Sequence, residues 1–144
     1  MQELARETLG RLCDRVELVR GFADDAPPGP FDGATCLLTL HFLPRDERLH
    51  LLHEIRRRLR PGAPIVVAHH SCPSGSDVRD WLSRSVAFGS GVDFQQARPS
   101  AGDMAPQLHV LPAAEDEAIL CDAGFSDVAL FYAGFSFRGW VAYA

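Results

Sequence analysis

Three histidines follow two apolar runs that the sequence predicts to be neighbouring strands. His41 comes after residues 34–40, and His69 and His70 come after residues 65–68. Because parallel strands bring their carboxyl ends to one edge of a sheet, we expect the three side chains to converge on one pocket. The pKa of a histidine lies near physiological pH, which suits a general base. We therefore predict that His41 is the catalytic residue; the alternative is a histidine that only makes hydrogen bonds within a loop.

The same three histidines, together with Cys72, are residue types that bind metal ions. His50 and His53 add a pair three residues apart, which would share one face of a helix. No HExxH motif or carboxylate triad accompanies them, and zinc sites usually have more closely spaced ligands. We therefore predict no bound metal, and a metal-dependent site on the histidines remains an alternative.

A strand, a helix and a second strand position these histidines. The first strand, residues 34–40, is a short apolar run typical of a strand that is covered on both faces. The helix starts at Pro44 and ends before Pro61 and Gly62. Its apolar face carries Leu49, Leu52, Ile55 and Leu59. The second strand is residues 65–68, and a helix between two strands implies a parallel pair with a right-handed crossover.

Arginines make the rest of this helix basic. Arg48 lies largely off the predicted apolar face. Four more arginines gather at the carboxyl end of the helix, namely Arg56, Arg57, Arg58 and Arg60. Positive charge is favourable at this end of a helix dipole, so we predict a solvated helix end rather than a nucleic-acid patch.

Weaker patterns precede and follow this unit. Residues 2–13 predict an amphipathic helix, and residues 16–19 alternate like a strand before a turn-rich segment over residues 21–30. After Ser71, one apolar spacing predicts a further helix with Val78, Trp81, Leu82 and Val86 on its buried face. Residues 89–112 lose this periodicity, so we predict a long loop of the kind that is usually functional or mobile, such as a lid.

The end of the chain reads as a helix and a hairpin. Residues 115–123 predict a short helix that Gly124 ends. Two strands follow near residues 127–132 and 135–143, with a turn at Ala133 and Gly134. Because their connection is short, we predict an antiparallel hairpin.

Length and composition bound the class of protein. The 144 residues suit a single domain over residues 1–144, and 47% hydrophobic with 23% charged residues is typical of a globular chain. A net charge of -5 argues against a nucleic-acid partner. No stretch reaches the ~20 apolar residues that span a bilayer, so we predict a cytoplasmic protein without membrane contact. The four scattered cysteines form no CxxC pair, and we expect reduced thiols.

Four stretches resemble, in order and spacing, the middle and C-terminal motifs of class I S-adenosylmethionine-dependent methyltransferases. They are residues 31–32 before the first strand, 38–43 at its end, 58–62 before the second strand and 123–125 before the hairpin. The resemblance implies an α/β fold with an incomplete Rossmann-like sheet, mostly parallel with a C-terminal antiparallel hairpin. It also implies S-adenosylmethionine as the cofactor and methyl transfer to an unidentified acceptor, with a small molecule as one candidate.

The glycine-rich GxGxG loop of that family, and the acidic residue that binds the cofactor's ribose, are not found in this sequence. Residues 1–6 resemble the segment that follows the acidic residue in family members. We therefore predict a truncated methyltransferase with impaired cofactor binding. A non-catalytic, oligomerising remnant of the same fold is the alternative.

The resemblance also implies which residues contact the cofactor. The adenine ring would be flanked by Phe22, Ala23 and Asp24, with a backbone amide of Ala23 or Asp24 contacting a ring nitrogen. The methyl-donor end would be lined by Leu38, Thr39 and Leu40. The alternatives are a plain loop for the first group and core strand for the second.

The missing part of the fold also predicts an exposed edge. In the family's strand order, strands absent here would lie between residues 16–19 and residues 34–40. Strand 34–40 would then become an apolar edge, and such edges pair or aggregate. We predict that the edge is covered by strand 16–19 or by a second copy of the chain in a homodimer.

Overall fold

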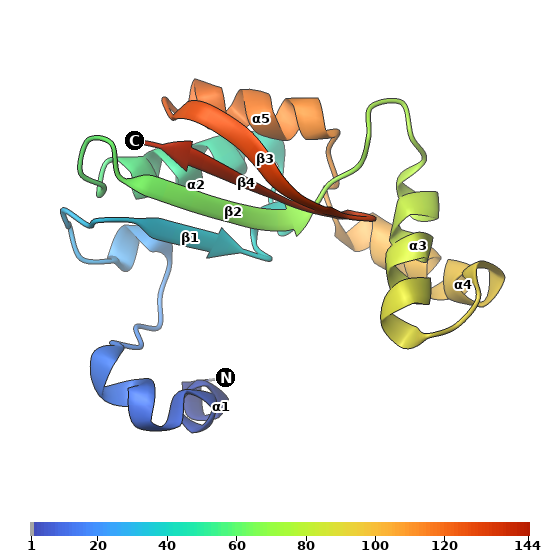
Figure 1. The fold of residues 1–144 in the computed structure, drawn as a ribbon, viewed down its shortest axis with the longest axis horizontal. Coiled ribbons are helices and arrows are strands. Elements are labelled where there is room, and N and C mark those ends of the chain that lie inside the picture. The colour runs from blue at the N-terminus through green and yellow to red at the C-terminus, as the bar shows by residue number, and fades with distance from the viewer. Residues whose placement is uncertain (1) are drawn as a thin grey trace.

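A computed structural model describes residues 2–144, so that Met1 of the predicted domain lies outside the described residues. Its four-stranded sheet has the order β1-β2-β4-β3 (Figure 1). The strands are β1 (Ala34–Leu37), β2 (Pro64–His70), β3 (Ser126–Gly134) and β4 (Phe137–Tyr143). β1 and β2 are parallel, and β4 is antiparallel to both β2 and β3. The predicted α/β class and the closing hairpin are therefore confirmed, with the hairpin turn at Phe135 and Ser136 rather than at Ala133 and Gly134.

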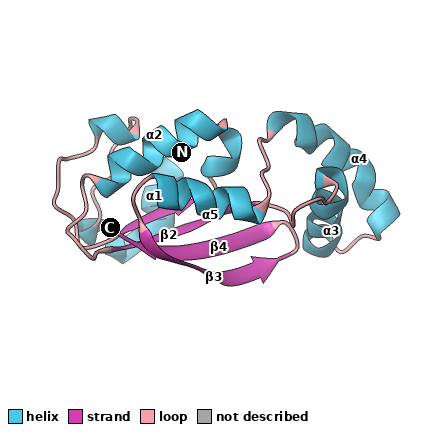
Figure 2. Cartoon of the chain, turned by 90° about the horizontal axis from the view of Figure 1, so that it is seen from above, coloured by secondary structure: helices cyan, strands magenta, loops and turns pink. Residues whose placement is uncertain are grey.

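Helices α2 (Arg45–Arg56) and α5 (Ala113–Asp122) cover one face of the sheet (Figure 2). The alternation of β2 directs Ile65 and Val67 to that face, since both are fully buried. The core between sheet and helices also contains Leu52, Ile119, Leu120, Trp140 and Ala142. Burying each large apolar side chain contributes roughly 1.5–3 kcal/mol, so this layer holds the carboxyl edge of the sheet in place.

The helix predicted after Ser71 is present, and a second helix occupies much of the segment predicted to be a long loop. Helix α3 (Val78–Ser90) is capped by Asp77, whose carboxylate accepts hydrogen bonds from the backbone N–H groups of Arg79 and Asp80. Helix α4 (Phe94–Met104) packs against α3 beyond the carboxyl end of β2 (Figure 1). The prediction of a long loop over residues 89–112 is therefore wrong for residues 94–107. Ala97 and Ala101 are buried four residues apart, and the prolines and glycines around them concealed this helical spacing.

The N-terminal residues form helix α1 (Gln2–Leu9) and the 3-10 helix η1 (Gly10–Arg15), which lie apart from the sheet (Figure 1). Residues 16–19 form no strand, and Val16 and Val19 are exposed. Within residues 2–144 no strand pairs with the outer edge of β1. The prediction that residues 16–19 cover this edge is wrong, because these residues do not form a strand beside β1. A second copy on the edge stays a prediction.

The boundaries of the central strands differ from those predicted. β1 ends at Leu37, because Leu38 has a φ of 55° and leaves the extended conformation. The 3-10 helix η3 (Leu40–Phe42) follows and carries His41. β2 runs two residues further than predicted and includes His69 and His70. The histidines therefore lie on regular elements rather than in loops.

The four cysteines form no disulfide with one another, as their scattered positions predict. Among the helices of residues 2–144, none combines the length and the apolar character that a membrane crossing requires.

Candidate functional site

A pocket of about 570 Å³ lies beside the carboxyl end of β1. Its walls come from the loop after residue 20, from the segment after β1 and from one side of α2. The lining residues are Gly21, Phe22, Ala23, Asp24, Thr39, Leu43, Glu47, His50 and Leu51. The structure thus brings together four of the six residues predicted to contact the cofactor, namely Phe22, Ala23, Asp24 and Thr39.

The loop of this pocket is closed on itself by Asp25. The backbone N–H of Phe22 donates to the Asp25 carboxylate at 2.9 Å, and the N–H of Asp25 donates to the Phe22 carbonyl at 3.1 Å. Within residues 2–144, the N–H groups of Ala23 and Asp24 have no hydrogen-bond partner. Phe22 is 87% exposed. The loop therefore offers two free amides beside an exposed aromatic ring.

Arg58 connects this loop to α2. Its guanidinium donates to the Asp24 carbonyl at 3.1 Å and to the Glu54 carboxylate at 2.6 Å. Hydrogen bonds from Arg57 and Arg58 lower the pKa of Glu54 to about 2. The prediction of a wholly solvated arginine cluster is wrong for Arg58, which is buried because it bridges the helix and the loop.

The two remaining cofactor predictions, Leu38 and Leu40, do not line the pocket. Leu38 is 54% exposed, and its backbone N–H donates to the Ala68 carbonyl at 2.7 Å, next to the end of β1. Leu40 is buried in the core between the sheet and its helices. Because the chain turns at Leu38, three consecutive side chains point in different directions. Leu38 faces solvent, Thr39 lines the pocket and Leu40 lies in the core.

The candidate metal ligands come together differently from the alternative considered for the sequence. In residues 2–144 one group of ligand atoms lies within 4.8 Å of one another, from Asp24, His50 and Glu54. His41, His69, His70 and Cys72 form no such group among these residues. Glu54 is already bound by Arg57 and Arg58, whose positive charges oppose a cation.

The side chains of His41, His69 and His70 lie together, as the sequence predicts, but they do not line the pocket beside β1. The ring centroid of His41 lies 4.8 Å from that of His70 and 6.4 Å from that of His69. All three side chains are buried. Burial lowers the pKa of His41 and of His69 to about 4, and it lowers the pKa of His70 as well. The cluster is therefore uncharged at neutral pH.

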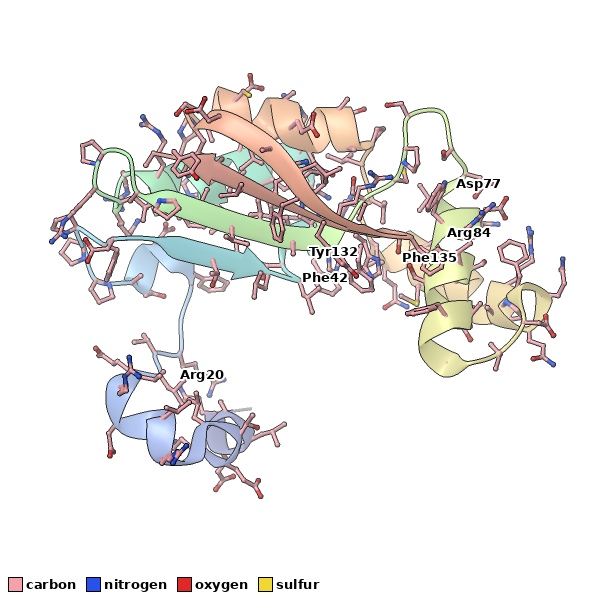
Figure 3. The ribbon with its side chains drawn as sticks, in the orientation of Figure 1. Arg20, Phe42, Asp77, Arg84, Tyr132 and Phe135 are labelled. Carbon is pink, nitrogen blue, oxygen red and sulfur yellow. The ribbon has the colours of Figure 1, made fainter. Side chains whose placement is uncertain are left out.

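Hydrogen bonds orient each ring of this cluster. The backbone N–H of His70 donates to His41 Nδ1 at 3.2 Å, and His69 Nδ1 lies 3.0 Å from the His70 carbonyl oxygen. His70 Nδ1 lies 2.8 Å from the hydroxyl of Ser136, which is 2.6 Å from that of Ser85 on α3. Figure 3 shows Phe42, Tyr132 and Phe135 at this end of the sheet. The cluster thus joins the sheet to the helices beyond it.

A buried ion pair that the sequence did not predict lies next to His69. Arg48 Nη1 lies 2.7 Å from Asp116 Oδ1, and His69 Nε2 lies 3.7 Å from the same oxygen. Arg48 also donates to the Leu43 carbonyl at 2.9 Å and to the His109 carbonyl. Burial raises the pKa of Asp116 to about 7, while Arg48 opposes this rise.

The prediction that Arg48 lies off the buried face is wrong, since its side chain is fully buried. Helical spacing could have found the pair. Arg48 lies four residues before the buried Leu52, and Asp116 lies three and four residues before the buried Ile119 and Leu120.

Known structures share this arrangement of strands and helices. The chain is similar to the apo structure of the S-adenosylmethionine-dependent methyltransferase SibL, with a TM-score of 0.70 and 18% identity over 99% of this chain and 40% of that one. It is similar to the pyocyanin biosynthetic protein PhzM, with a TM-score of 0.70 and 21% identity over 97% of this chain and 39% of that one.

The human N-acetylserotonin methyltransferase in complex with S-adenosylmethionine gives a TM-score of 0.63 and 16% identity, over 90% of this chain and 34% of that one. The sequence has no significant match among protein-family models or curated proteins. The chain spans about 40% of the length of SibL. Its four-stranded sheet, with β1 and β2 parallel and a closing hairpin, is the fold of the C-terminal region of class I S-adenosylmethionine-dependent methyltransferases.

Proposed function

We propose that this chain carries the adenosine half of a cofactor site, in an enzyme that transfers a methyl group from S-adenosylmethionine to an acceptor. The observation that supports this most is the pocket beside β1, where the predicted adenine loop and Thr39 meet. Sheets of this kind bind their ligands at the carboxyl ends of the strands. The fold of the chain is that of a methyltransferase region, and the pocket lies where such a ligand is expected.

In this proposal the adenine ring lies against Phe22, and a free amide of Ala23 or Asp24 donates to a ring nitrogen. Aromatic stacking on a base contributes roughly 1–3 kcal/mol. Thr39 lies further along the same pocket, towards the methyl-donor end. Leu38 is exposed beside it, whereas Leu40 supports the turn from within the core. Methyl transfer is an in-line displacement, so these residues act by positioning the reactants.

The methionine end of the cofactor has fewer partners in these 144 residues. The sequence has no GxGxG loop whose amides would approach that end. We therefore expect weak binding of S-adenosylmethionine. We also expect adenosine to bind almost as tightly as S-adenosylhomocysteine, because the homocysteine part adds few contacts.

Calorimetry with adenosine and with S-adenosylhomocysteine tests this proposal. We expect dissociation constants within about threefold of each other, and Phe22→Ala should weaken both by roughly tenfold through the loss of stacking. Phe88→Ala is the matched control, because Phe88 is similarly exposed but lies on α3, away from the pocket. Binding that both variants weaken equally, or that neither variant weakens, would contradict the proposal.

The acceptor that we propose is a small molecule. Two of the similar structures are named for such compounds, namely N-acetylserotonin for the human enzyme and pyocyanin for the biosynthetic protein PhzM. Thin-layer analysis of radiolabelled methyl transfer from S-adenosylmethionine to a small-molecule extract would identify it. Label that stays in protein or nucleic acid would contradict this choice.

The outer edge of β1 favours a second, compatible function, which is association of two copies. Leu37 on β1 is exposed, and within residues 2–144 no strand pairs with that edge. Unpaired apolar edges tend to pair with another chain. Light scattering should therefore show a dimer that Leu37→Lys weakens, and a monomer at high protein concentration would contradict this proposal.

A further inference from the structure

Helices α3 and α4 are joined to each other by several kinds of contact. Arg98 of α4 pairs with Asp80 of α3 at 3.0 Å. The Arg84 guanidinium of α3 lies 5.9 Å from the ring centroid of Phe94 on α4, within the range of a cation–π interaction. The buried residues of the two helices are Leu82, Ser83, Ala97 and Ala101. We therefore expect α3 and α4 to move as one body.

The two chain segments that connect this body to the sheet are anchored side by side. The backbone N–H of Cys72, just after β2, donates to the Leu111 carbonyl at 3.1 Å. The N–H of Ala113 donates to the Cys72 carbonyl at 2.8 Å, and the N–H of His109 donates to the His41 carbonyl at 2.7 Å. Two connectors that leave the sheet at neighbouring positions form a hinge for the body that they carry.

Beyond these anchors the connectors are loosely packed. Gly75 has a φ of 74°, and a Cβ at this position would meet no atom within 4 Å. The N–H of Leu108 makes only a long hydrogen bond of 3.4 Å to the Ala105 carbonyl. A cavity of about 590 Å³ lies between residues 77–79 at the start of α3 and residues 105–110. The space around both connectors therefore allows them to bend.

Further along α3, Ser85 and Phe88 hold the body against the hairpin turn. Ser85 Oγ accepts a hydrogen bond from the Ser136 backbone N–H at 3.0 Å and lies 2.6 Å from Ser136 Oγ. The ring centroids of Phe88 and Phe135 are 5.4 Å apart, and Figure 3 shows Phe135 next to α3. Among the described residues of α3 and α4, Ser85 alone makes a hydrogen bond to the sheet or its hairpin turn. Few contacts therefore have to break for the body to move.

We propose that α3 and α4 form a gate, which turns as one body about its two connectors and is held closed by Ser85 and Phe88. In the closed state Ser136 is fully buried, and its hydroxyl lies 2.8 Å from His70 Nδ1. Moving Ser85 away uncovers Ser136 and the end of the sheet that carries His70. Closing helices and loops often control access to a site in this way. The gate is independent of the proposed cofactor site, whose pocket is lined by other elements.

Spin-label distances in the full chain test this gate. One label goes on the exposed Cys121 of α5 and the other on Ser100→Cys, an exposed position of α4, with Cys13→Ser to avoid a third label. We expect a closed distance and a longer, open one. Ser85→Ala should raise the ratio of open to closed roughly tenfold, because it removes the hydrogen bonds to Ser136. One distance that is the same with and without Ser85→Ala would overturn the proposal.

A second variant and a matched control come from the same helix. Phe88→Ala leaves the core intact, since Phe88 is 77% exposed, and it should raise the ratio of open to closed about threefold through the loss of the ring contact. Ser90→Ala is the control, because Ser90 is exposed at the end of α3 and should leave the ratio unchanged. If Ser90→Ala changes the ratio as much as Ser85→Ala, or if Phe88→Ala has no effect, the proposed role of these contacts is refuted.

A label pair within the gate tests whether it moves as one body. Labels on Gly89→Cys of α3 and Ser100→Cys of α4, with Cys13→Ser and Cys121→Ser, should give one distance that Ser85→Ala leaves unchanged. A longer or broader distance would show that the helices separate or unfold, which would overturn the proposal. Adenosine should bind equally well with and without Ser85→Ala. A chain that binds no adenosine would therefore contradict the cofactor site alone, whereas the label distances decide the gate.

Discussion

Replacing Arg48 with methionine removes the positive charge from a fully buried ion pair. Methionine keeps much of the unbranched side chain, so the packing between α2 and α5 changes little. The Asp116 carboxylate then loses its partner at 2.7 Å, and the carbonyls of Leu43 and His109 lose their donors. Asp116 Oδ2 already has no hydrogen-bond partner. The variant therefore leaves a buried charge with almost no compensation.

The expected loss is about 3–5 kcal/mol in the free energy of unfolding, the usual cost of breaking a buried pair. This is a large share of the roughly 5–15 kcal/mol that stabilises a domain. Burial already raises the pKa of Asp116 to about 7, and without Arg48 it must rise further. A carboxyl whose folded pKa is raised stabilises the fold at low pH and loses this contribution as the pH rises through the folded pKa. The cost of Arg48→Met should thus be smaller at about pH 5.5 than at about pH 8.

Urea denaturation followed by the fluorescence of the buried Trp140 measures this loss at both pH values. The double variant Arg48→Met with Asp116→Leu is the control, because it removes both charges and fills the site with apolar groups. We expect it to recover most of the stability lost in the single variant. A loss below about 1 kcal/mol at both pH values, or a double variant as unstable as the single one, would refute the reasoning.

Three further predictions concern the loop, its support and the histidines. Gly21→Ala should abolish measurable adenosine binding in calorimetry, because the new Cβ would lie 2.7 Å from Asp25 Oδ2, whereas Gly89→Ala meets no atom within 4 Å and should bind normally. Arg58→Lys should weaken adenosine binding by roughly fivefold, since lysine cannot bridge Glu54 and the Asp24 carbonyl at once; unchanged binding would show that the loop needs no such support. Lowered histidine pKa values stabilise the fold above the ordinary pKa of 6.5 and lose this contribution as the pH falls towards 4, so the urea midpoint should drop over that window, and a flat profile would contradict the burial of His41 and His69.

The central part of the fold could be predicted because local and long-range preferences agree there. The apolar face of α2 and the short apolar runs of β1 and β2 each specify one element, and the helix between the strands fixes their parallel pairing. The hairpin of β3 and β4 followed from the short connection.

The remaining elements depend on partners that a local pattern does not contain. Residues 16–19 alternate like a strand but pair with no strand, although the outer edge of β1 is unpaired within residues 2–144. Helix α4 contains Pro99 in its interior, and its buried face consists of small alanines that contribute little to an apolar pattern. In both cases the local sequence pattern is weak, and tertiary contacts decide the secondary structure.

In the candidate site, too, some features could be predicted from the sequence and others depend on distant partners. The convergence of His41, His69 and His70 followed from the rule that parallel strands end at one edge. Their protonation could not be predicted, because it depends on which backbone group donates to each ring nitrogen. The pairing of Arg48 with Asp116 joins residues 68 positions apart, and a charged residue on a helix is more often exposed than buried.

Chemical-shift mapping of adenosine on the amide-labelled chain tests the central claim most directly. We predict that the amides of Ala23 and Asp24 shift most, since they are the free donors of the pocket, with smaller shifts at Thr39 and along the pocket side of α2. No shift of the Ala23 and Asp24 amides at saturating adenosine, or a set of shifts centred on α3 and α4, would contradict the claim that this chain carries the adenosine half of a methyltransferase site.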